Sequence, residues 1–275
     1  MFDLEGSDDQ RLQRARARVA VQFGFRDGRT RLARLHQSGS AKALMPDLPG
    51  SPEVVFLNTA GGLTGGDRVE FNLDLEAGAR ATATTQAAER VYAAASGVAR
   101  MRCRASVGAG GALDWLPQET ILYDRAALER ETVIDLAGDA RLLFCETLVL
   151  GRAAMGEELR ALRLRDRREI RRDGRPELVD CVRMDEGVLA LAADPAVLGG
   201  ARAVALLALV APGAEDALGP VRALLDEPGV AAAASAWNGR CLVRLMAGDA
   251  WPLRRQMIRL LTQIRGTAPP RVWQM

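Results

Sequence analysis

The chain has 275 residues, which is enough for one large domain with a substantial buried core. Its 37 lysine and arginine residues nearly balance its 35 aspartate and glutamate residues, so the formal net charge of +2 provides no global field to attract nucleic acid or an anionic membrane. The four cysteines form no C-x-x-C pair, and the acidic, polar N-terminus does not resemble a secretion signal. We therefore expect free thiols and a cytoplasmic protein.

The first predicted elements are short strands. Arg18 to Phe25 alternates loosely and ends at the Asp27-Gly28 turn, which predicts a hairpin with Thr30 to His36 as its returning strand. The segment Met45 to Pro52 contains three prolines and is typical of a connecting loop. It leads to an apolar strand at Val54 to Leu57.

A glycine-rich loop, residues 58–67, joins this strand to an alternating strand at Val69 to Leu75. Positive φ, or an approach of backbone where a Cβ would clash, is predicted at its two glycine pairs, Gly61, Gly62, Gly65 and Gly66. A phosphate cradle is not expected, because Asp67 stands where a Walker loop needs lysine. A dinucleotide site is not expected either, because a strand follows instead of a helix. A tight hairpin or bulge with a solvated Asp67 is the plain structural alternative.

Further strands separated by glycine turns follow, at Arg80 to Gln86, Ala99 to Val107, Leu113 to Tyr123, Thr132 to Leu136 and Arg141 to Leu150. Pro117 must lie at an edge or a bulge, because it cannot donate to a β-ladder. The regular succession of short strands favours an all-β stack, sandwich or solenoid, although no strict repeat period is visible.

The arginine-rich stretch Arg163 to Arg175 is interrupted by three acidic residues and turns at Asp173-Gly174. We interpret it as a solvated hairpin rather than a nucleic-acid site. Its returning strand, Leu178 to Met184, places Asp180 among apolar neighbours. The longest apolar run, Ala203 to Ala211, is too short to span a bilayer and predicts a buried strand.

Helical periodicity appears late in the chain, at Glu215 to Asp226 and at Trp251 to Ile264, and predicts two surface helices packed on the β body. The chain ends in a segment expected to be extended, whose Trp273 either docks on a partner or covers the core. We expect a single domain, with a β body over about residues 18–200 and a helix-containing part over about residues 201–275.

The sequence lacks the catalytic motifs of most hydrolases. The sequence contains neither a G-x-S-x-G elbow nor an H-E-x-x-H motif, and its single histidine, His36, cannot supply a metal triad or a catalytic relay alone. A pair of carboxylates would still serve a glycosidase, so a β-helical carbohydrate-active enzyme is the enzymatic alternative. An aromatic content of 4% counts against an aromatic-lined sugar groove.

Several motifs occur in an order that resembles the UreD (UreH) family of urease accessory proteins. They are the glycine-rich loop 58–67, residues 84–92 (Thr-Thr-Gln-Ala-Ala-Glu-Arg-Val-Tyr), residues 115–119 (Trp-Leu-Pro-Gln-Glu), residues 150–157, and the final Pro-Arg-Val-Trp. The residues that carry the resemblance outside the loop are Thr84, Thr85, Gln86, Tyr92, Trp115, Pro117, Gln118, Glu119, Gly151, Arg152, Gly156 and Glu157. The chain departs from the family pattern at residues 39–41 and shows little resemblance after Gly199 until its tail.

The resemblance implies a mainly β fold, a β-helix-like stack of short strands with two helices toward the C-terminus. It also implies a non-enzymatic chaperone required for nickel insertion into apo-urease, a scaffold and nickel conduit that binds UreF and, through UreF, the GTPase UreG. No tightly bound cofactor is expected, because transient nickel would meet weak oxygen ligands rather than a closed site. The acids that the resemblance implies for this nickel path are Asp67, Glu89, Glu146 and Asp180. A salt bridge to arginine is the structural alternative for each of them.

Overall fold

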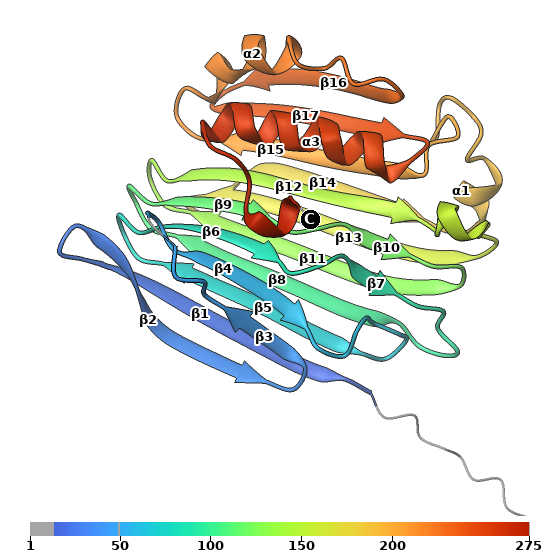
Figure 1. Cartoon of the computed structure of the whole chain (residues 1–275), viewed down its shortest axis with the longest axis horizontal. Helices are drawn as coiled ribbons and strands as arrows, with labels where there is room; N and C mark the ends of the chain where they lie inside the picture. Colours follow the sequence, from blue (N-terminus) through green and yellow to red (C-terminus); the bar gives the residue numbers. More distant parts are fainter. Residues whose placement is uncertain (1–13, 49, 275) are drawn as a thin grey trace, which may run out of the picture.

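Two stacked β-sheets make up most of the computed structural model, which describes residues 14–48 and 50–274 (Figure 1). The first sheet has seven strands in the order β14-β13-β11-β8-β5-β1-β2. Their bounds are β1 (Arg16–Arg26), β2 (Arg29–Ser38), β5 (Arg68–Leu75), β8 (Ala99–Val107), β11 (Ala126–Leu136), β13 (Leu162–Arg172) and β14 (Arg175–Met184).

The second sheet has ten strands, eight of them in the order β16-β17-β15-β12-β9-β6-β4-β3, with β10 pairing β12 and β7. Their bounds are β3 (Ala41–Leu44), β4 (Glu53–Asn58), β6 (Arg80–Thr85), β7 (Glu89–Val91), β9 (Ala112–Leu116), β10 (Thr120–Leu122), β12 (Arg141–Leu150), β15 (Ala203–Val210), β16 (Val230–Trp237) and β17 (Arg240–Ala247).

The chain alternates between the sheets, from β4 to β5, β6, β8, β9, β11, β12 and β13, so that each coil adds one strand to each sheet. Neighbouring coils pair in parallel, as in β5-β8-β11-β13 of one sheet and β4-β6-β9-β12 of the other. Antiparallel hairpins close both ends of the first sheet. This arrangement confirms the mainly β, β-helix-like stack.

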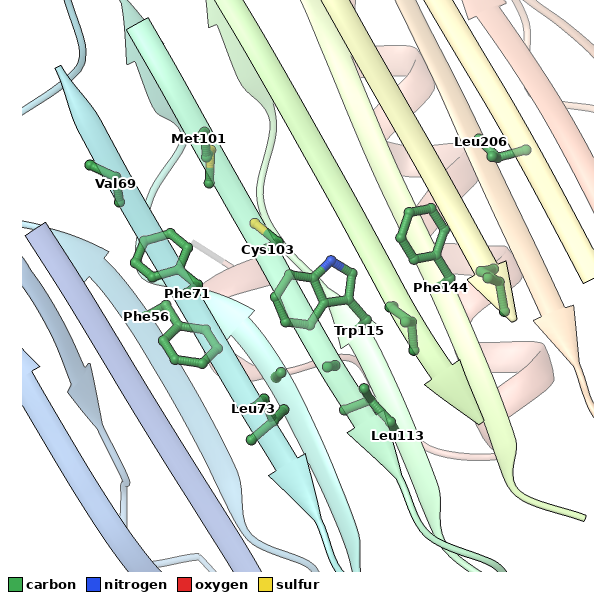
Figure 2. Close-up of a cluster of buried hydrophobic side chains, with 14 of the residues drawn as sticks. Phe56, Val69, Phe71, Leu73, Met101, Cys103, Leu113, Trp115, Phe144 and Leu206 are labelled. Carbon is green, nitrogen blue, oxygen red and sulfur yellow. The ribbon is translucent and has the colours of Figure 1, made fainter. Parts of the chain in front are cut away.

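The main core lies between the sheets, where the apolar face of each alternating strand turns inward (Figure 2). Phe56 of one sheet stacks on Phe71 of the other, with ring centroids 5.0 Å apart, and Trp115 lies 6.1 Å from Phe56. Small residues on β6 let the layers approach closely, since Ala81 and Ala83 are both buried.

A third layer covers part of the outer face of the ten-stranded sheet, over β15, β16 and β17. Helix α3 (Ala250–Arg265) runs across β15 and β17 and buries Leu253, Met257, Leu260 and Leu261 in a second core (Figure 1). Asp249 caps its N-terminus through the Trp251 amide, and Gly266 ends it in the left-handed conformation. The remaining helical elements are short: α1 (Glu186–Ala190), α2 (Leu218–Arg222), and the 3-10 turns η1 (Ala153–Met155), η2 (Ala214–Ala217) and η3 (Arg271–Trp273).

Three expectations need correction, and one helix was not predicted. The helix predicted at Glu215 to Asp226 divides into η2 and α2. The strand predicted at Leu113 to Tyr123 is interrupted after Leu116, because Pro117 cannot continue the ladder, and resumes as β10. The tail expected to be extended forms η3, and α1 was not expected at all.

The hairpin at Asp27-Gly28, the hairpin at Asp173-Gly174 and the buried strand over Ala203 to Ala211 are confirmed. In the predicted loop Met45 to Pro52, residue 49 lies outside the described residues, and the others form no strand or helix. No helix in the described part of the chain is long and apolar enough to cross a membrane.

Candidate functional site

The glycine-rich loop joins β4 of one sheet to β5 of the other, so it connects the layers and is not a hairpin. Gly61, Gly62 and Gly66 have φ of 79°, 153° and 92°, and a Cβ on Gly65 would collide with the Ser96 carbonyl. Both predicted reasons for the glycines are therefore confirmed. A Cβ on Gly62 would also strike the ring of Tyr92.

Asp67 holds this loop together instead of pointing into solvent. It is 5% exposed, and its two carboxylate oxygens accept hydrogen bonds from the Ala15 and Thr64 amides, each at 2.8 Å. The interpretation of a solvated Asp67 is wrong, because the backbone amides of two segments replace water around its carboxylate.

Residues of three motifs meet at the end of the stack next to this loop. The Tyr92 hydroxyl donates to the Gly61 carbonyl at 3.1 Å, and its ring packs edge-on against Tyr123 with centroids 5.0 Å apart. The Arg152 guanidinium lies 4.3 Å from the centroid of Tyr123 and donates to Glu157 at 3.0 Å. Residues from motifs that are distant in the sequence therefore contact one another at the same end of the stack.

Glu89 lies beside a cavity of about 140 Å³ between the glycine-rich loop and the segment after β6. The cavity reaches inward to two core rings and outward to the motif residues, and its lining includes Phe56, Phe71, Asn58, Thr85, Gln86 and Glu89. Burial raises the pKa of Glu89 to about 7, because the hydrogen bond from Asn58 (3.4 Å) and the charge of Arg90 offset only part of the desolvation. Near neutral pH the protonated and the charged forms of this carboxylate are therefore both populated.

Glu146 is in a different environment, inside a charged network that bridges the two sheets. It is 2% exposed and accepts hydrogen bonds from Thr132 at 2.9 Å and Arg168 at 2.8 Å, and Arg130 lies 2.9 Å away. Arg130 also forms a bidentate pair with Asp166, at 2.8 and 2.6 Å. This network, hereafter the buried charge network, consists of Arg130, Glu146, Asp166, Arg168, Asp180 and Arg244.

Asp180 completes the buried charge network at its edge. One of its oxygens accepts from Arg168 at 2.7 Å, and the other accepts from Arg244 at 2.6 Å. Burial alone would raise the pKa of Asp166, but Arg130 and Arg168 outweigh it and hold that pKa below its usual value. Three carboxylates face three guanidinium groups, but only Arg130 and Arg168 are buried, and Arg244, with 63% of its side-chain surface exposed, balances the third acid from the surface.

The buried charge network corrects the interpretation of Arg163 to Arg175 as a solvated hairpin. Asp166 and Arg168 are 2% and 4% exposed, because they continue the inward face set by Leu164 and Ile170. The alternation of the strand could have located them, since residues 164, 166, 168 and 170 share one face. Their charged partners, Arg130 of β11 and Glu146 of β12, are not predicted by any local pattern.

The motif Trp115 to Glu119 is held by the end of the chain. Arg254 of α3 donates to Gln118 at 2.6 Å and to Glu119 at 2.7 Å, and its guanidinium lies over the ring of Trp273. The Trp273 indole donates to the Leu116 carbonyl at 3.0 Å and is 2% exposed. Of the two possibilities for this tryptophan, the structure shows the one in which it covers the core.

The four predicted acids therefore do not gather into one site. Among the described residues, no group of three or more His, Cys, Asp or Glu side chains is placed to hold a metal ion. Their part in a nickel path stays a prediction, and the structure separates Glu89, which lines a cavity, from three acids whose oxygens already have partners.

Comparison with known proteins finds the same family that the motifs resemble. The sequence model of the UreD urease accessory protein family matches residues 15–274. The chain is 58% identical over 264 residues to the urease accessory protein UreD of Cereibacter sphaeroides, with 96% of each chain covered. It is 53% identical over 266 residues to that of Paracoccus denitrificans, covering 96% of this chain and 94% of the relative, and 47% identical over 267 residues to that of Rhizobium leguminosarum, covering 96% and 97%. The chain therefore belongs to the UreD family of urease accessory proteins.

Proposed function

We propose that this chain acts in urease maturation as a non-enzymatic chaperone of nickel insertion. In this proposal it binds UreF in the cytoplasm, reaches the GTPase UreG through UreF, and passes nickel to apo-urease. Membership of the UreD family supports the role in maturation. The carbohydrate-active alternative gains no support from relatives that are accessory proteins.

The observation that carries the nickel part of the proposal is the state of Glu89. Its carboxylate lines a cavity, and burial raises its pKa to about 7. A desolvated carboxylate without a full set of partners gains from an approaching cation, and oxygen ligands alone hold Ni²⁺ loosely enough for release. Glu89 is therefore suited to transient contact with nickel rather than to storage of it.

Glu146 and Asp180 would have to act differently. Each has its carboxylate oxygens bonded to arginine or threonine, so nickel could bind only after an arginine moved away. Neutralising either acid would also leave a buried guanidinium short of a partner. A fall in nickel incorporation could then come from lost stability as well as from a lost nickel contact. Glu89→Gln is consequently the cleaner test of the proposed path.

The experiment is to express Glu89→Gln together with UreF, UreG and apo-urease, and to purify the assembled complex. Urease activity and bound nickel are then measured per assembled complex. Glutamine keeps the volume of the side chain but removes the charge, so assembly should be retained while nickel incorporation falls several-fold. The matched control is Glu158→Gln, because Glu158 is an exposed acid that does not line the cavity.

Full nickel incorporation by Glu89→Gln would contradict the part of Glu89 in the path. Failure of the wild-type chain to co-purify with UreF and apo-urease would contradict the scaffold itself. Equal loss in Glu89→Gln and Glu158→Gln would also count against the proposal, because it would point to a general effect of charge.

A further inference from the structure

The outer face of the seven-stranded sheet carries a row of arginines that runs across six strands. Successive register partners form this first row: Arg16, Arg68, Arg100, Glu129, Arg165 and Arg183. Arg100 and Arg183 have 46% and 75% of their side-chain surface exposed, and Arg16, Arg68 and Arg165 are also exposed. Five positive charges therefore accompany one negative charge in this row.

A second row lies two residues further along the same strands and contains Arg18, Glu70, Arg102, Glu131, Arg167 and Cys181. Between the rows, the surface is hollowed over β8, β11, β13 and β14, with a volume of about 480 Å³. A second hollow of about 230 Å³ shares Arg100 and Arg102 with the first and extends over β5. We call these two hollows together the arginine trough.

The positive charge of the first row is only partly neutralised within the chain. Glu129 lies 3.1 Å from Arg100 and Asp185 lies 3.8 Å from Arg183, whereas Arg68 stands in register between Arg16 and Arg100. Like charges directly opposite one another on neighbouring strands destabilise a sheet. The row therefore stores a repulsion that an anionic ligand would relieve.

The positive charge is concentrated at one end of the sheet. Further along the same outer face, the register row of Asp74, Ser106, Asp135 and Arg171 holds two acids and one arginine. A ligand would therefore be drawn to the trough and not to the face as a whole. Arginine binds carboxylates through two parallel hydrogen bonds, which suits it to acidic side chains.

We propose that the arginine trough binds an acidic segment of a protein partner. Glu70, Glu129 and Glu131 stand among the arginines and would repel the continuous charge of a nucleic-acid backbone, whereas a polypeptide can present amides to them and carboxylates to the arginines. Glu89 is not among the lining residues, so this surface is independent of the proposed nickel contact.

Cys181 provides a local reporter of the trough. It lines the larger hollow, and it is the exposed one of the four cysteines, all of which lie in the described part of the chain. The probe is a synthetic ten-residue glutamate peptide added to the full-length protein, and the rate of alkylation of Cys181 is measured with and without it. The peptide should slow alkylation at low salt and lose this effect at about 0.5 M salt, where screening acts over a few ångströms.

Arg100→Gln, Arg165→Gln and Arg183→Gln combined should weaken binding of the labelled peptide by about tenfold or more, since each exposed ion pair contributes a factor of about 2 to 5. The matched control combines Arg29→Gln, Arg31→Gln and Arg34→Gln, which remove the same charge from exposed positions of β2 and should leave binding unchanged. Thermal unfolding of both variants checks their folding.

Unprotected Cys181 in the wild-type protein would overturn the proposal, and this measurement needs no variant. Equal loss of binding in the two triple variants would overturn it too, because it would show attraction by net charge alone. Stronger protection by a single-stranded DNA oligonucleotide of the same charge would reassign the trough to nucleic acid.

Discussion

Replacing Glu89 by glutamine should stabilise the protein at high pH and not at low pH. Burial raises the pKa of Glu89 from 4.5 to about 7, so the folded state holds this proton more tightly than the unfolded state does. The free energy of unfolding contributed by Glu89 therefore falls as pH rises from about 4.5 to about 7, and is constant above that range. A glutamine has no proton to lose and escapes this penalty.

The magnitude follows from the shift of the pKa. One pKa unit corresponds to about 1.4 kcal/mol, so the penalty at pH 8 is at most about 3.5 kcal/mol, and partial exposure of the side chain reduces it to about 1–2 kcal/mol. Urea unfolding of the wild type and of Glu89→Gln at pH 5 and pH 8, followed by tryptophan fluorescence, measures the difference directly. Effects of the substitution that do not depend on pH cancel when the two values are subtracted.

Glu158→Gln serves as the control in the same assay, because Glu158 is exposed and should show no such change between the two pH values. An equal stability difference between Glu89→Gln and wild type at pH 5 and pH 8 would refute the reasoning. It would mean that Glu89 is well solvated in the folded protein, and the argument for its contact with nickel would fail with it.

Three further substitutions test the architecture by the same urea unfolding. Arg130→Met should lower the free energy of unfolding by about 3–5 kcal/mol, because it leaves buried carboxylates short of a partner; a loss under about 1 kcal/mol would contradict the buried charge network. Gly62→Ala should cost about 1–3 kcal/mol, since φ is 153° and the new methyl group meets Tyr92, and retention of full stability would disprove that contact. Trp273→Ala should cost about 3–5 kcal/mol, and unchanged stability would show that the tail is not part of the core.

The sequence predicts the elements that follow a strong local rule. Paired glycines mark the loop at Gly61 to Gly66, and the three- and four-residue spacing of apolar positions marks α3 within one residue of its N-terminus and C-terminus. Alternation locates β8 at both of its ends. For α3 and β8 the pattern depends on one face being buried, and for the loop it depends on backbone conformation; each is a property of a single element.

Other elements are not predicted from the sequence, because contacts with neighbouring elements stabilise them. Residues Val230 to Trp237 form β16, although most of them are alanines with a weak strand preference, since pairing with β17 decides their conformation. Asp166 and Arg168 have charged side chains that suggest solvent, yet the opposite sheet supplies Glu146 as their neighbour. Local sequence holds no information about which strand of the other sheet faces a given position.

Contacts between the two sheets also make the four predicted acids unequal as candidate nickel ligands. Glu146 and Asp180 are already paired with arginines, so a divalent cation would have to displace a guanidinium group from them. Glu89 begins the short strand β7, which pairs with the short strand β10, and it accepts a hydrogen bond from the Asn58 amide at 3.4 Å. Burial raises its pKa, because the hydrogen bond from Asn58 and the charge of Arg90 offset only part of the desolvation. A buried carboxylate whose charge is only partly offset favours brief contact with a cation. We therefore expect nickel transfer to depend on Glu89 more than on Glu146 and Asp180.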